Sequence, residues 1–144
     1  MSLQLLKQVF DLKSAVIGSA LMSIIVGLVN AGHGLTPALT AAGKQALYTF
    51  FVAGFIMQLC RWLAGRDLPP VKAIFSATLL PTLLTVFLVY NLHSLKGTPE
   101  PLWSTLPVAV ICLVSFFLVS RAVVAEQADA AAERLSLKGV KDYF

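Results

Sequence analysis

The chain has 144 residues, of which 58% are hydrophobic and 12% are charged, whereas a typical soluble domain carries about 25% charged residues. No charged residue occurs in positions 14–43, 73–95 or 101–120. Because elements on the surface of a soluble fold need a polar outer face, this composition excludes a soluble globular protein, a disordered chain and a nucleic-acid-binding module, despite a net charge of +4. It is typical of a polytopic membrane protein.

The N-terminal segment, residues 1–13, has the pattern of an amphipathic helix. Its polar side chains recur at helical spacing and its apolar side chains fill the opposite face; the polar ones are Gln4, Lys7, Gln8 and Asp11. Such a helix beside a membrane span lies in the interface, with its lysines at the headgroups.

Residues 14–122 contain four apolar windows, each about 20 residues long, which is the length that crosses a hydrocarbon core of about 30 Å. The predicted spans are 14–32, 44–64, 73–93 and 102–122, separated by segments rich in Gly and Pro. Short loops make sequence neighbours antiparallel. The predicted fold class is therefore all-α: a four-transmembrane-helix up-and-down bundle with an N-terminal interfacial helix and a C-terminal cytoplasmic helix.

The distribution of Lys and Arg predicts the orientation of the spans. With the N-terminus inside, nine basic residues lie on the inner side, and two, Lys44 and Lys96, lie on the outer side. We therefore expect a multi-pass protein of the cell inner membrane with both termini in the cytoplasm. A cleaved signal peptide ending near Val29–Ala31 is the alternative for the first window, but cleavage would leave an odd number of spans and weaken the charge bias.

Residues 123–144 predict an Ala-rich cytoplasmic helix. Val124, Ala128, Ala131 and Leu135 are spaced four, three and four residues apart, which places them along one seam. This helix is either a solvated extension of the fourth span or a docking helix for a second subunit.

Small residues recur every four positions in the first span: Ala15, Ser19, Ser23, Gly27 and Ala31. A face of small residues lets two helix backbones approach closely. We expect this face to pack on a neighbouring helix, either of the same chain or of another copy. In the third span, Pro81 predicts a kink, with threonine hydroxyls nearby that can satisfy backbone groups.

Polar side chains concentrate at the outer ends of the spans and form the candidate ligand-binding set: Asn30, His33, Gln45, Tyr48, Tyr90, Asn91 and His93. We expect the two histidines to share one polar cluster. Each is followed 28 residues later by an arginine, Arg61 or Arg121, so the two helical hairpins could be copies related by an axis along the membrane normal. Polar helix ends at the lipid interface are the alternative for the whole set. A metal or haem site is a weaker one, because two histidines are fewer ligands than zinc usually takes.

Catalytic patterns are missing from the sequence. It has no acidic residue or lysine in the middle of a span, no paired carboxylates and no phosphate-binding glycine loop. The first span lacks the membrane-embedded carboxylate on which small multidrug exporters depend. Cys60 and Cys112 lie at different depths, which argues against a disulfide. We expect no catalytic residue, no metal site and no cofactor.

These features predict a non-enzymatic accessory or scaffold subunit of a larger inner-membrane assembly. Its partners would be the lipid bilayer and either other membrane subunits or copies of itself, and not nucleic acid. The alternative is a homo-oligomeric channel or carrier for a small solute, with its polar site at the outer ends of the helices.

Overall fold

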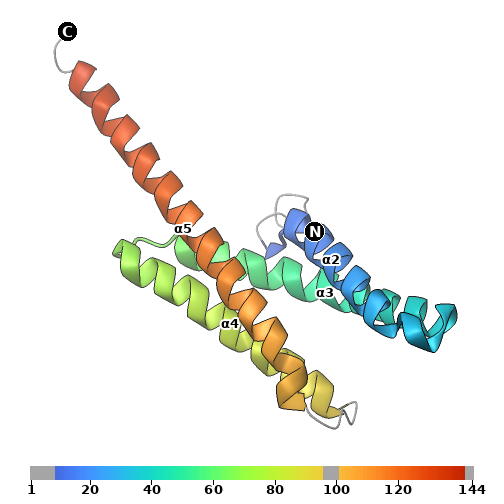
Figure 1. Ribbon diagram of the computed structural model, residues 1–144. Coiled ribbons are helices and arrows are strands. Elements are labelled where there is room, and N and C mark those ends of the chain that lie inside the picture. Colours follow the sequence, from blue (N-terminus) through green and yellow to red (C-terminus); the bar gives the residue numbers. More distant parts are fainter. Residues whose placement is uncertain (1–8, 96–100, 142–144) are drawn as a thin grey trace. The chain divides into compact units, whose positions relative to one another are not determined.

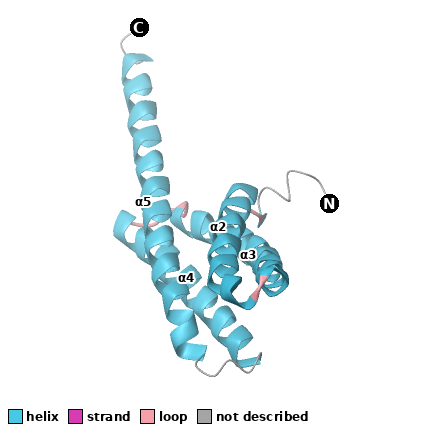
Figure 2. Cartoon of the chain, turned by 45° about the vertical axis from the view of Figure 1, so that its right-hand side comes forward, coloured by secondary structure: helices cyan, strands magenta, loops and turns pink. Residues whose placement is uncertain are grey.

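The computed structural model describes residues 9–95 and 101–141, and in these ranges the regular structure is entirely helical, with no strand (Figures 1 and 2). The helices are α2 (Leu12–Asn30), the short 3-10 helix η1 (Ala31–His33), α3 (Leu35–Ala64), α4 (Pro70–Leu95) and α5 (Pro101–Lys141). Four of them, α2 to α5, are long and apolar enough to cross a membrane. They suggest a multi-pass membrane protein.

The chain forms two compact units, Met1–Leu59 and Cys60–Phe144, whose boundary lies inside α3. The first unit contains α2, η1 and most of α3. The second contains the end of α3 together with α4 and α5.

Three helices begin with a proline in their first turn. Pro70 and Pro101 are the first residues of α4 and α5, and Pro37 is the third residue of α3. The first amide groups of a helix have no intrahelical carbonyl partner, so a proline there sacrifices no hydrogen bond. Pro37 is therefore compatible with a helix that begins at Leu35, nine residues before the predicted start at Lys44. The sequence had suggested that the Pro-containing segment after Gly32 begins a loop, but Pro37 belongs to the helix.

The connection between α2 and α3 is correspondingly tight. η1 continues directly from α2, and Gly34 follows it with φ of 98°. Its amide donates to Ala31 O (3.2 Å) and its carbonyl accepts from Ala38 N (3.2 Å). A positive φ of this size favours glycine because a Cβ would be strained there, so Gly34 allows the chain to reverse direction within one residue.

Glycines bring α2 and α3 together as an antiparallel pair in the first unit. A methyl group at Gly18 would lie 3.4 Å from Ala53 Cβ, and one at Gly27 would lie 3.5 Å from Ala42 Cβ. A methyl group would thus already be in van der Waals contact with α3, and a longer side chain pointing the same way would have to displace it, so the two backbones approach closely.

The segment before α2 is anchored on α3. Asp11 N donates to Gly54 O (3.0 Å), and Asp11 Oδ1 accepts from Ser14 N (3.0 Å) as the N-cap of α2. The Phe10 ring packs so closely on Gly54 that a Cβ there would overlap it. Phe10 and Asp11 are non-helical, so α2 begins at Leu12. Most of the predicted interfacial helix, residues 1–8, lies outside the described residues.

In the second unit α4 and α5 form an antiparallel pair along a row of small and hydroxyl side chains. Ala73, Ala77, Thr78, Thr82 and Thr85 of α4 are all buried. α4 continues as one helix through the fully buried Pro81. The end of α3 packs on the same pair, since the buried Cys60 thiol donates to Phe116 O (3.7 Å).

α5 is a single helix of 41 residues, about 60 Å long at about 1.5 Å per residue. This is twice the thickness of a hydrocarbon core. Its C-terminal part, after Gln127, extends beyond the end of α4 (Figure 1). The predicted fourth span and the predicted C-terminal helix are therefore one continuous element.

Candidate functional site

The predicted outer polar residues are divided between the two units. Asn30, His33, Gln45 and Tyr48 belong to the first unit, and Tyr90, Asn91 and His93 belong to the second. His33 is exposed at the end of η1. The side chain of His93 lies outside the described part of the chain. The expected cluster of His33 and His93 therefore stays a prediction, as does the duplication of the two hairpins.

The amide side chains of this set are hydrogen-bonded within their own helices. Asn30 Nδ2 donates to Val26 O (2.8 Å), Gln45 Nε2 donates to Thr49 Oγ1 (2.9 Å), and Asn91 Nδ2 donates to Phe87 O (2.7 Å). Each bond satisfies one donor of the amide locally. Asn30 and Asn91 lie near the ends of α2 and α4, whereas Gln45 and Thr49 lie inside α3. All three bonds leave fewer groups free to bind a solute.

The small-residue face of α2 contacts α3 over part of its length. Ala15 is fully buried, and Gly27 faces Ala42 of α3. Ser19 and Ser23 donate to the backbone of α2 itself, at Val16 O and Ala20 O (3.0 Å each). Ala31 lies in η1 and is exposed. The strict four-residue spacing did not include Gly18, which also packs directly on α3.

The α4–α5 interface contains a buried hydroxyl pair. The Oγ1 atom of Thr78 and the Oγ atom of Ser120 lie 3.2 Å apart, and Ser120 Oγ also contacts Phe117 O (2.9 Å). One turn further along α4, Thr82 Oγ1 donates to Thr78 O (2.7 Å) and Thr85 Oγ1 donates to Pro81 O (2.8 Å). In a membrane such groups must be satisfied inside the protein, and here they are.

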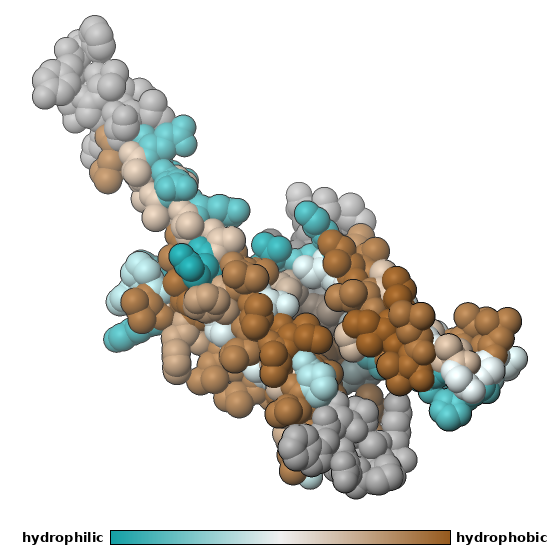
Figure 3. Space-filling model, viewed as in Figure 1, coloured by the Kyte–Doolittle hydropathy of each residue, from teal (hydrophilic) through white to brown (hydrophobic). Residues whose placement is uncertain are grey.

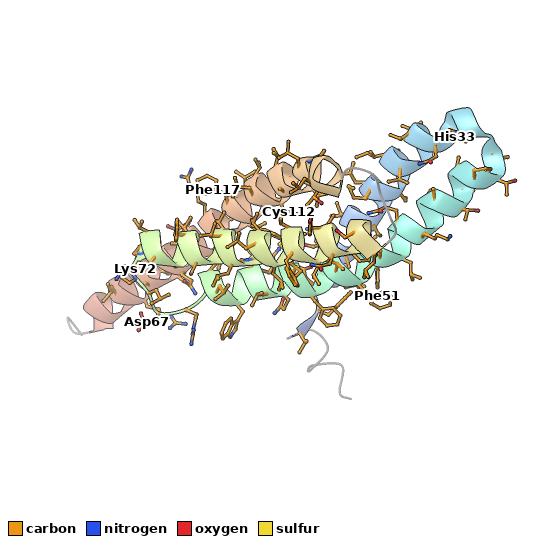
Figure 4. The ribbon with its side chains drawn as sticks, turned by 90° about the horizontal axis from the view of Figure 1, so that it is seen from below. His33, Phe51, Asp67, Lys72, Cys112 and Phe117 are labelled. Carbon is orange, nitrogen blue, oxygen red and sulfur yellow. The ribbon has the colours of Figure 1, made fainter. Side chains whose placement is uncertain are left out.

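The two cysteines are free thiols and form no disulfide. Cys60 is buried against α5, as described above. Cys112 of α5 is half-buried. Figure 4 shows Cys112 and Phe117 on α5, which lies alongside α4. Both cysteines act as small side chains of helix interfaces.

A groove with a volume of about 470 Å³ lies between α4 and α5. Its apolar walls include Ile74, Phe75 and Leu79 of α4 and Leu113 and Phe117 of α5. The polar side chains that line it are those of Thr78 and Arg121. The Arg121 guanidinium lies over the Phe117 ring, with 5.8 Å between its carbon and the ring centroid. No sequence pattern distinguished this groove, because it is formed by residues of two helices.

No group of three or more His, Cys, Asp or Glu side chains that could hold a metal ion occurs among the described residues. No family model, no curated protein and no solved structure matches this chain.

Proposed function

We propose that this chain is a non-enzymatic subunit that helps to hold a larger assembly together in the inner membrane. Its four spans form an up-and-down bundle with both termini in the cytoplasm, as the excess of basic residues at one end predicts. The observation that supports this role is the length of α5, because its C-terminal part extends away from α4 (Figure 1).

The extension presents an unpaired apolar seam. Leu135 is 72% exposed, and Ala128 and Ala131 are exposed on the same face. In a heptad built on these positions, Glu126, Asp129 and Glu133 fall on the outer face, away from the seam. A second helix could therefore pack on the seam without placing these carboxylates at the contact.

The membrane-facing surface is consistent with this proposal. Hydrophobic side chains cover much of the visible surface of both units, whereas hydrophilic ones accompany pale small residues along the extension of α5 (Figure 3). The apolar part provides contact with lipid or other spans, and the extension provides contact outside the membrane. One chain can in this way contact a partner both within the membrane and outside it.

The alternative proposal is a homo-oligomeric channel or carrier for a small solute. It requires polar side chains that point into a shared path. The local hydrogen bonds of Asn30, Gln45 and Asn91 favour the subunit role over this alternative, since they occupy groups that a solute site would use.

Two adjacent alanines of α5 provide a matched test of the seam. Ala131→Glu places a charge in the seam, and Ala130→Glu places the same charge on the outer face, with a similar helix propensity in both variants. After gentle detergent extraction, we expect the wild-type chain and Ala130→Glu to be recovered in a particle heavier than the monomer. Ala131→Glu should be recovered mainly as the monomer. A wild-type protein that is a stable monomer would contradict the proposal.

A further inference from the structure

Arg121 is placed well inside the end of the α4–α5 pair. Gln127 Nε2 donates to Gly65 O (3.1 Å), so Gln127 lies level with the turn between α3 and α4. Arg121 precedes Gln127 by six residues, or about 9 Å along the helix. Its neighbour Ser120 is fully buried against Thr78 of α4. The backbone of Arg121 therefore lies more than one helical turn inside the end of the α4–α5 pair.

The surroundings of Arg121 are apolar. On its own helix, the positions three and four residues away are Phe117, Leu118, Val124 and Ala125. The nearest acidic residue in sequence is Glu126, which is five residues away and so faces another side of the helix. The Arg121 side chain is exposed, and an arginine near the end of a span can extend to the headgroup level, where an anion can pair with it.

The groove beside Arg121 continues deeper into the unit along apolar side chains. Phe75 is 65% exposed and Phe117 is 42% exposed, so both present their rings to whatever fills the groove. The Thr78 hydroxyl in the wall is already paired with Ser120. The groove thus combines apolar walls with the cationic side chain of Arg121.

We propose that this groove binds an anionic phospholipid. The headgroup phosphate pairs with Arg121, and one acyl chain lies along Phe75, Leu79 and Leu113. The guanidinium supplies paired donors that match phosphate oxygens. Lys72, exposed in the first turn of α4, adds positive charge at the same end (Figure 4). Basic pockets between membrane helices select anionic headgroups by this chemistry.

Native mass spectrometry of the purified chain tests the proposal, using detergent micelles that contain equal amounts of phosphatidylglycerol and phosphatidylcholine. We expect the wild type to retain phosphatidylglycerol preferentially. Arg121→Gln should lower that preference about fivefold, the loss expected for one basic side chain near the headgroups. Arg134→Gln removes an exposed arginine further along the same helix and should leave the preference unchanged.

A second pair of variants tests the apolar part of the site. Leu79→Trp fills the groove, whereas Leu80→Trp adds the same bulk to an exposed neighbour outside it. We expect Leu79→Trp to lower the bound amount of both lipids relative to Leu80→Trp. Equal binding by these two variants, an unchanged preference in Arg121→Gln, or a wild type without preference would each overturn the proposal. If Arg121→Gln does not fold, Arg121→Lys is measured in its place, at low and at high salt. A preference of this variant for phosphatidylglycerol that high salt leaves unchanged would then overturn the proposal.

Discussion

The Thr78 hydroxyl of α4 lies 3.2 Å from the Ser120 hydroxyl of α5, and both side chains are buried. This pair joins two antiparallel helices across 42 residues of sequence. In a bilayer, where both helices are already apolar, packing and interhelical hydrogen bonds of this kind are what hold helices together.

We expect Thr78→Val to lower the free energy of unfolding by about 0.6 kcal/mol, the average for interhelical hydrogen bonds in membrane proteins. Ser120→Ala should have a similar effect, and the double variant should show coupling between the two sites. Unfolding in mixed micelles of increasing denaturing detergent measures these changes. Ser76→Ala is the control, because Ser76 Oγ donates within α4, to Ala73 O. Additive effects of the two substitutions would contradict a direct bond.

The close approach of α2 and α3 predicts that Gly18→Leu destabilises the first unit. The added side chain must displace Ala53, and overpacking of this kind costs about 1–3 kcal/mol. Gly43 is the matched control, since a Cβ there meets no atom within 4 Å. Gly43→Leu should be neutral or stabilising because leucine favours a helix more than glycine does. Thermal unfolding in detergent compares the two, and equal melting temperatures would show that Gly18 does not set the helix distance.

The proposed topology predicts which introduced cysteines react with a membrane-impermeant maleimide. In intact cells, Thr98→Cys should be labelled from outside and Ser136→Cys should not, because basic residues favour the cytoplasmic side. The native Cys60 is buried and Cys112 is half-buried, so the unsubstituted chain measures background labelling. Permeabilised cells should label both introduced cysteines. The reverse pattern in intact cells would exclude cytoplasmic termini.

The subunit proposal also predicts that the purified chain transports nothing by itself. Liposomes containing it should show the same flux of ions and small neutral solutes as empty liposomes. The channel or carrier proposal predicts a flux that His33→Ala and His93→Ala alter. Such a flux, absent from both empty and heat-treated samples, would favour the alternative function.

The sequence by itself was enough to predict four apolar helices, because the hydrocarbon thickness sets a length that composition reveals directly. It also placed Pro81 inside the third span, as the structure does. The start of the second span could not be located in the same way. A proline such as Pro37 often marks a loop, but it is also compatible with the first turn of a helix. The residues around Pro37 do not by themselves distinguish these two possibilities.

The pairing of Thr78 with Ser120 and the groove beside Arg121 appear only once α4 and α5 are packed. Apolar spans show little amphipathic pattern, since lipid and protein interior are both apolar, so the sequence does not indicate which face of a helix turns inward. Gly18 illustrates the same point, because it packs on Ala53 although it falls outside the four-residue repeat. Helix crossing, and not spacing along one helix, brings these side chains together.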